Sequence, residues 1–184
     1  MTKKILFIVG SNRRNSFNKQ LANEIIAMIG ERAECSVLDY SDVPFLNQDE
    51  EYPAPAAIER LRASVAAVDA LWIITPEYNA SYPGLLKNVL DWLSRPVVRN
   101  DYATPTVVRG KKLTISGAAG KSAAGHARKK VAELLRFMGA ELFKDEGCGV
   151  ALGGESFGSD KLIMNDEARN TIQEQVNGFL AFVE

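Results

Sequence analysis

Polar side chains crowd the segment that follows the first apolar run, Ile5–Val9. Neutral hydrogen-bond donors recur through it, at Ser11, Ser16 and Asn18, and either Arg13 or Arg14 can add a charged one. Helical spacing of apolar residues begins directly afterwards, so the segment joins a strand to the first turn of a helix. The free amides and positive dipole end of such a turn attract anions, and serine, asparagine and arginine add further donors. This chemistry suits a terminal phosphate, although the same residues could only cap the helix and meet solvent.

A second loop, Thr75–Gly84, offers aromatic faces and an amide group. It follows the third apolar run and holds, in order, Pro76, Glu77, Tyr78 and Asn79. A planar heterocycle needs such a setting, because a flat surface can stack on it while polar groups fix its edges. The alternative is a turn whose tyrosines only seal the end of a sheet.

The third loop, Ser116–Gly125, reads SGAAGKSAAG and consists almost entirely of small residues. Small side chains let a backbone approach a ligand closely, but a flexible connector has the same composition. Together the three loops combine a phosphate site, an aromatic loop and a closely approaching backbone. The combination indicates a phosphorylated planar ring of the size of FMN as the ligand.

Apolar runs that could be strands alternate with amphipathic helical patterns along the chain. The expected strands are Ile5–Val9, Cys35–Leu38, Ala70–Ile74, Leu113–Ile115 and, less clearly marked, Glu141–Phe143 or Val150–Leu152. The expected helices are Asn18–Ile29, Ala56–Val68, Leu85–Leu93, Ala124–Met138 and Asn165–Phe182. This alternation predicts an α/β fold with a five-stranded parallel sheet, order 2-1-3-4-5, and helices on both faces. All three loops then leave the carboxyl ends of strands, where ligands bind in such sheets.

Size and composition predict a single domain over residues 1–184. Hydrophobic residues make up 46% and the net charge is −1, which favours neither nucleic acid nor a membrane surface as partner. No run approaches the ~20 apolar residues of a membrane span, and Ile5–Val9 is too short for the core of a signal peptide. Cys35 and Cys148 have no metal-site or disulfide pattern, so we expect reduced thiols, no metal and a cytoplasmic location.

Two stretches of this sequence resemble motifs of the NADPH-dependent FMN reductase family. GSNRRNSFNKQLA is similar to the family's GSxRxxSxN opening, and TPEYNASYPGLLKNVLDWLSRP is similar to its PEYN loop and the following helix. The resemblance implies a flavodoxin-like fold, non-covalently bound FMN, and NADPH or NADH as co-substrate. It also implies a small-molecule electron acceptor (a flavin, quinone, azo compound or chromate) and a homodimer or homotetramer.

The resemblance also implies roles for individual residues. The positions that match the family's phosphate site are Ser11, Arg13, Ser16 and Asn18. Those that match its ribityl and ring loop are Pro76, Glu77, Tyr78 and Asn79, and the third loop is expected to meet the flavin at Ser116 and Gly117. The commoner family loop contains Ser-Pro-Gly, which this chain lacks, so contacts beyond Gly117 are not carried over.

The implied activity is hydride transfer from NAD(P)H to FMN and onward to the acceptor, in ping-pong order. Flavin carries this chemistry, so we expect no catalytic side chain. Three other functions stay open: a flavodoxin-type electron carrier, a flavin-binding accessory or regulatory protein, and a phosphate-ester enzyme. The last ranks lowest because the first loop holds no cysteine and no histidine lies near it.

The expected helix Leu85–Leu93 is more apolar than a sheet-covering helix needs. Its apolar side chains fill an arc of roughly 160°, whereas covering a sheet takes about 100°. The excess predicts either a subunit interface anchored by Trp92 or burial against another segment of the same chain.

Overall fold

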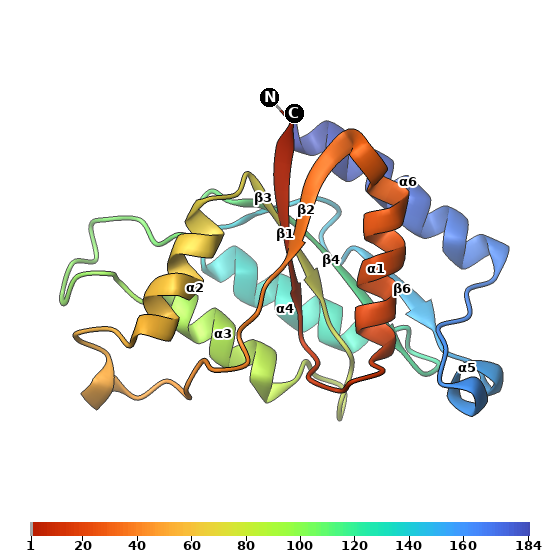
Figure 1. Cartoon of the computed structure of the whole chain (residues 1–184), viewed down its shortest axis with the longest axis horizontal. Helices are drawn as coiled ribbons and strands as arrows, with labels where there is room; N and C mark the ends of the chain where they lie inside the picture. The colour runs from red at the N-terminus through yellow and green to blue at the C-terminus, as the bar shows by residue number, and fades with distance from the viewer. Residues whose placement is uncertain (1) are drawn as a thin grey trace.

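The computed structural model describes residues 2–184 and has one parallel sheet at its centre (Figure 1). The strands are β1 (Lys3–Val9), β2 (Ala33–Val37), β3 (Ala70–Ile74), β4 (Lys112–Ala119), β5 (Glu141–Leu142) and β6 (Cys148–Ala151). Their order is β2-β1-β3-β4-β5, and β6 also pairs with β4. The predicted order is therefore confirmed. The fifth position is shared by two short strands, one in each of the two segments considered for it.

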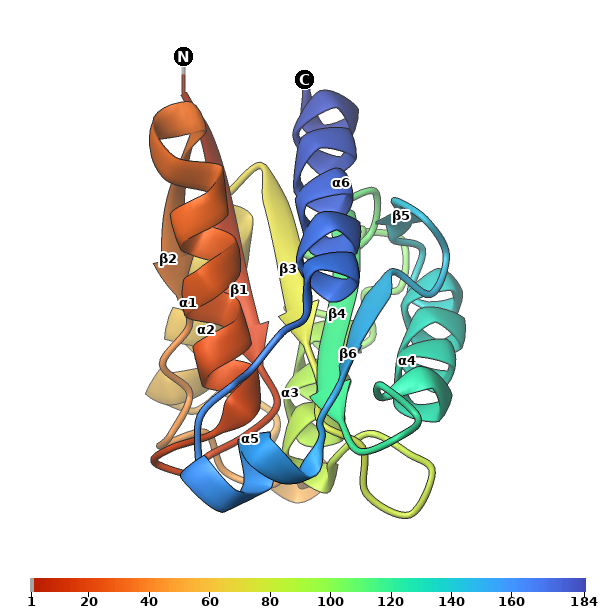
Figure 2. The same ribbon diagram turned by 90° about the vertical axis from the view of Figure 1, so that its right-hand side faces the viewer.

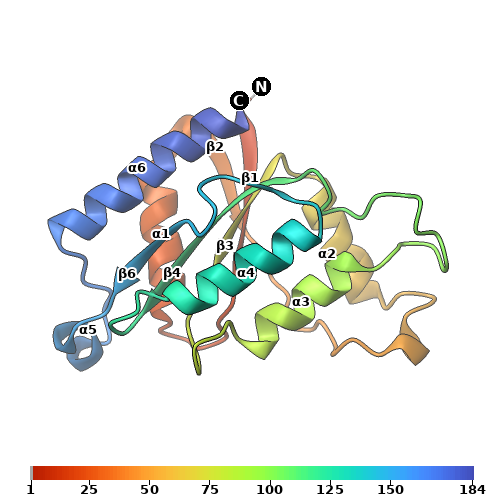
Figure 3. The same ribbon diagram turned by 180° about the vertical axis from the view of Figure 1, so that it is seen from behind.

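Helices cover both faces of the sheet. They are α1 (Phe17–Ile29), α2 (Ala56–Ala66), α3 (Gly84–Ser94), α4 (Gly125–Phe137), α5 (Gly154–Ser159) and α6 (Asp166–Val183), with short 3₁₀ turns η1 (Gly30–Arg32) and η2 (Gln48–Glu50). One face carries α1 and α6 (Figure 2), and the other carries α2, α3 and α4 (Figure 3). The expected helices are all present, with ends shifted by at most two residues, while α5 was not predicted.

Burial on both faces explains why the strands are apolar runs. Ile5, Phe7 and Val9 of β1 face α1 and α6, whereas Leu6 and Ile8 face the opposite helix layer. A strand covered on both sides has no polar face, as is usual in parallel sheets. Within the described residues, no helix combines the length and the apolar character needed to cross a membrane.

β4 is longer than the sequence predicted, because the first four residues of the expected third loop belong to it. Its end is held by β6, with Ser116 paired to Cys148 and Ala119 paired to Ala151. Glycine and alanine have weak strand propensity, so the run SGAA gives no local signal. The neighbouring strand imposes the conformation.

The prediction that Trp92 anchors a subunit interface is wrong. Its side chain is 1% exposed, and its indole Nε1 donates to the carbonyl oxygen of Pro44 at 2.8 Å. Asn88 of the same helix also donates to Pro44, at 2.9 Å, and accepts from the amide of Leu46. The loop before α2 therefore covers the extra apolar arc of α3, which was the alternative.

Candidate active site

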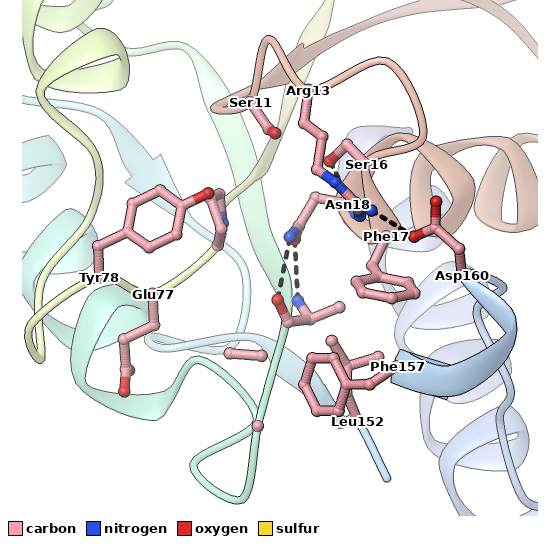
Figure 4. A pocket seen from close by; sticks show the side chains of 14 residues that line it. Ser11, Arg13, Ser16, Phe17, Asn18, Glu77, Tyr78, Leu152, Phe157 and Asp160 are labelled. Atoms are coloured by element: carbon pink, nitrogen blue, oxygen red, sulfur yellow. Dashed lines mark hydrogen bonds and ion pairs between the residues drawn. The ribbon is translucent and has the colours of Figure 1, made fainter. Parts of the chain in front are cut away.

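A cavity of about 390 Å³ opens at the edge of the sheet where β1, β3 and β4 end (Figure 4). Four segments line it: the β1–α1 loop with the first turn of α1, the loop after β3, the end of β4 with Gly120, and the chain after β6. Most of the predicted site residues lie on its wall, namely Ser11, Arg13, Ser16, Asn18, Pro76, Glu77 and Tyr78. Three do not, namely Asn79, Ser116 and Gly117.

The β1–α1 loop presents an unsatisfied row of backbone donors. Ser16 is the N-cap of α1, and its hydroxyl accepts from the amides of Asn18 at 3.2 Å and Lys19 at 3.4 Å. The backbone N–H groups from Asn12 to Ser16 donate to no group among the described residues. Ser11 lies at the cavity and is largely buried. Free amides at a helix N-terminus form an anion site, so this loop fits a phosphate group.

Arg13 brings the positive charge to this cavity. Its Nη1 donates to the carbonyl oxygen of Asn15 at 2.8 Å, and its Nη2 pairs with Asp160 at 2.5 Å. The guanidinium carbon lies 5.3 Å from the ring centre of Phe17. Arg14 makes no side-chain hydrogen bond or ion pair with any described residue and does not line the cavity. The two adjacent arginines therefore differ in position, and only Arg13 lines this cavity.

The side-chain amide of Asn18 is hydrogen-bonded within the protein itself. Its Nδ2 donates to the carbonyl oxygen of Ala118 at 2.9 Å, and its Oδ1 accepts from the amide of Ala118 at 2.9 Å. Only 3% of the residue is exposed. Both polar atoms of the Asn18 side chain are thus used in joining the start of α1 to the end of β4, so Asn18 holds two walls of the cavity in register.

The loop after β3 contains a tight hairpin. The amide of Tyr78 donates to the carbonyl of Ser81 at 2.9 Å, and the reverse bond is 3.0 Å. The two residues between them, Asn79 and Ala80, have φ of 51° and 55°, as in a type I′ turn. This turn places Asn79 at the tip, outside the cavity, and leaves Tyr78 at the cavity with 57% of its surface exposed.

Glu77 caps a helix across the site. Its Oε2 accepts from the amide of Ala127 at 3.0 Å, in the first turn of α4. The N-cap residue of that helix, Ala124, has no side chain able to do so. Partial burial raises the pKa of Glu77, but hydrogen bonds from Ser122 and from the amide of Ala127 outweigh it and bring the pKa below the ordinary value. Glu77 is therefore ionised at neutral pH and ties the second loop to the third.

Ser116 and Gly117 lie inside β4 and serve packing. The hydroxyl of Ser116 accepts from the indole of Trp72 at 3.0 Å and donates to Gln175 of α6 at 2.8 Å, so it faces the interior. Gly117 packs closely against the carbonyl oxygen of Thr75, at the start of the second loop, and against Ala124. The third-loop residues at the cavity are instead Ala118, Ala119 and Gly120.

Replacing Gly117 with alanine is expected to lower the free energy of unfolding by about 1–3 kcal/mol, the usual cost of overpacking. A Cβ there would lie 2.4 Å from the carbonyl oxygen of Thr75 and 2.7 Å from the Cβ of Ala124. Gly120→Ala is the matched control, since its Cβ would meet nothing within 4 Å. Urea denaturation measures both variants, and equal stabilities would contradict the close packing described.

The fourth wall of the cavity was not predicted from the sequence. Leu152, Phe157 and Asp160 come from the segment after β6 and line the cavity opposite Tyr78 (Figure 4). No motif marks this segment, whose only local signals are glycines at its start and a lone phenylalanine. Its place at the site depends on β6 leading the chain back to the carboxyl edge of the sheet.

The match to known proteins decides the family. The family model for NADPH-dependent FMN reductase matches residues 3–146. The chain belongs to the NADPH-dependent FMN reductase family. It is 30% identical over 181 residues to an NAD(P)H-dependent FMN reductase of Pseudomonas aeruginosa, covering 98% of this chain and 95% of that protein. It is 31% identical over 183 residues to a quinone reductase of Pseudomonas putida, covering 98% and 94%.

A solved structure supports the same assignment. The flavoenzyme NAD(P)H:(acceptor) oxidoreductase FerB of Paracoccus denitrificans superposes with a TM-score of 0.85 at 28% identity, covering 99% of this chain and 97% of that one. The flavodoxin-like fold, an oxidoreductase activity, FMN as cofactor and NAD(P)H as co-substrate are thereby confirmed.

The residues present fit FMN. A cavity of about 390 Å³ is within the range of small-ligand sites. The free amides and Arg13 suit its phosphate, and Tyr78 with the backbone of the second and third loops suits a flat ring.

Proposed function

We propose that this enzyme reduces small acceptors of the quinone class with NAD(P)H, using FMN held in the cavity between the β1–α1 loop and the loop after β3. The observation that carries the proposal is the meeting of Arg13 and a row of free amides with Tyr78 in one cavity. A quinone is favoured as acceptor because relatives across nearly the whole chain are named quinone reductases. Flavins, azo compounds and chromate are the other acceptor classes to compare.

The proposed roles follow the geometry. Ser11, Arg13 and the amides up to Ser16 hold the phosphate, while Pro76, Glu77 and Tyr78 shape the ring site. Asn18 orients the third loop instead of binding the phosphate, because its amide is engaged by Ala118. The backbone from Ala118 to Gly120, at the end of β4, has the role of contacting the flavin that was expected of Ser116 and Gly117.

No side chain at the cavity is assigned a catalytic proton transfer. Glu77 is the one carboxylate of the second loop, and its lowered pKa and its bonds to α4 suit a structural cap. FMN bound in this cavity would supply the redox chemistry, which is hydride transfer from NAD(P)H to the acceptor. The protein contributes binding, orientation and an open face for two substrates in turn.

Steady-state kinetics test whether NAD(P)H and the acceptor use the same face of the flavin in turn. We expect parallel double-reciprocal lines when NAD(P)H is varied at several fixed concentrations of benzoquinone, the ping-pong pattern. Each substrate should also inhibit competitively against the other at high concentration. Intersecting lines would show that both substrates bind together, which would rule out the shared face.

We also propose that the chain acts in the cytoplasm as a homo-oligomer. Both cysteines, Cys35 and Cys148, are free thiols, as is usual in a reducing compartment. Val97, Val98 and Tyr102, on the segment after α3, are exposed large hydrophobic residues that a partner subunit would cover. Sedimentation equilibrium tests the assembly, and Val98→Asp should favour the monomer. A monomeric wild-type protein would contradict it.

A further inference from the structure

The segment 152–162, here called the strap, forms one wall of the cavity and is fastened to α1. Gln20 of α1 makes the backbone attachment: its Nε2 donates to the carbonyl oxygen of Asp160 at 3.2 Å, and its Oε1 accepts from the amide of Leu162 at 2.7 Å. Figure 2 shows α5, which lies within the strap, beside the amino-terminal end of α1. The strap lies beyond residue 146, where the family model ends.

Side chains add a second attachment at the phosphate loop. Asp160 Oδ1 accepts from Arg13 Nη2 at 2.5 Å, and Asp160 Oδ2 accepts from Asn15 Nδ2 at 3.2 Å. The rings of Phe17 and Phe157 meet edge to face with centres 5.7 Å apart. Arg13 thus lies between the loop and the strap, with Asn15, Asp160 and the Phe17 ring each limiting its orientation.

The guanidinium still has donors for a ligand. Arginine carries five N–H groups, and the contacts with Asn15 and Asp160 use one on each Nη. The unused donors, including that on Nε, remain for an anion at the cavity. Asp160 and a phosphate are both negative, so Asp160 can assist phosphate binding only indirectly, by holding Arg13 or, through Asn15, the backbone of the β1–α1 loop.

We propose that Asp160 is a positioning residue for the FMN phosphate: it fixes the Arg13 guanidinium at the cavity and so couples the strap to occupancy of the phosphate site. This inference rests on the proposed function, in which Arg13 binds the phosphate. Fixing the side chain in advance removes part of the entropy cost of binding. By linkage, phosphate binding must in turn stabilise the strap in its fastened position.

The backbone at Asp160 allows a clean substitution. Its φ is 57°, a left-handed conformation that aspartate and asparagine tolerate better than other side chains except glycine. Asp160→Asn therefore keeps the backbone and the size of the residue and removes the charge. Glu155→Gln is the matched control, because Glu155 is an exposed acid on the same strap that does not line the cavity.

The test compares FMN with riboflavin, which has the same ring without the phosphate. Isothermal titration of the apo-protein should show Asp160→Asn binding FMN about threefold to fivefold more weakly, as expected for a half-exposed ion pair, with riboflavin affinity unchanged. Glu155→Gln should change neither affinity. In an Arg13→Ala background, Asp160→Asn should no longer weaken FMN binding, and should leave it equal or tighter because a negative charge near the phosphate is removed.

Several results would overturn the inference. They are equal weakening of FMN and riboflavin, tighter FMN binding by Asp160→Asn, and an undiminished effect in the Arg13→Ala background. A wild-type protein with no preference for FMN over riboflavin would remove the phosphate assignment together with the role of Asp160. NAD(P)H-dependent flavin reduction, measured on the same samples, shows separately whether the proposed function holds.

Hydrogen exchange checks the reciprocal effect on the strap. FMN should slow amide exchange in a peptide containing Leu162 more than saturating riboflavin does, and Asp160→Asn should abolish the difference. Equal protection by the two flavins would mean that the strap responds to the ring alone, which contradicts coupling through Arg13.

Discussion

Replacing Asn18 with leucine is expected to lower the free energy of unfolding by about 2–6 kcal/mol. The leucine keeps the approximate size of the side chain but leaves the N–H and C=O groups of Ala118 without partners, and each unmade bond of this kind costs about 1–3 kcal/mol. Ala118 is 2% exposed, so water cannot readily replace the lost bonds. FMN affinity should fall as well, because the same bonds hold the β1–α1 loop against β4.

Urea denaturation of the apo-protein measures the first effect and isothermal titration with FMN the second. Asn23→Leu is the control, since Asn23 lies on the exposed side of the same helix and makes no side-chain hydrogen bond with a described residue. If the two variants lose the same stability, the paired bonds to Ala118 contribute no more than an exposed asparagine.

Replacing Arg13 with alanine should weaken FMN binding about tenfold to a hundredfold. A hydrogen bond to a charged group contributes roughly 1.5–3 kcal/mol, and 1.4 kcal/mol corresponds to about one decade in affinity. Arg13 lines the cavity, whereas Arg14 does not, so Arg14→Ala should change affinity little. Both variants remove one positive charge from the same loop. The difference between their FMN affinities therefore reports the effect of the position of Arg13 and not the effect of net charge.

Titration of FMN into each apo-protein, repeated at raised salt, provides the measurement. The Arg14→Ala variant should follow the wild type at both salt concentrations. The assignment of the phosphate site to Arg13 would be contradicted if Arg14→Ala weakened binding as much as Arg13→Ala, or if Arg13→Ala bound FMN as tightly as the wild type.

Local patterns in the sequence were enough to predict the frame of this fold. β3 begins and ends where its apolar run does, and α1 starts beside the Ser16 cap. Such signals are local because burial on both faces makes a strand apolar, and a cap must lie at the helix terminus. The same loops pointed to the cavity, because the carboxyl ends of parallel strands meet at one edge.

The features that the sequence did not predict depend on distant partners. The end of β4 is a strand because β6 pairs with it, and Trp92 is buried because the Pro44 loop folds over α3. Asp160 reaches Arg13 across 147 positions of sequence. No periodicity or spacing encodes these contacts. The sequence therefore predicted neither the strap nor which residues of the third loop line the cavity.

Anaerobic addition of NAD(P)H to the FMN-loaded protein tests the central claim most directly. With no acceptor present, one equivalent of NAD(P)H should bleach the visible absorbance of one equivalent of bound flavin, and a quinone added afterwards should restore it. Flavin that stays oxidised until the quinone is present, or a protein that binds no FMN, would contradict the account.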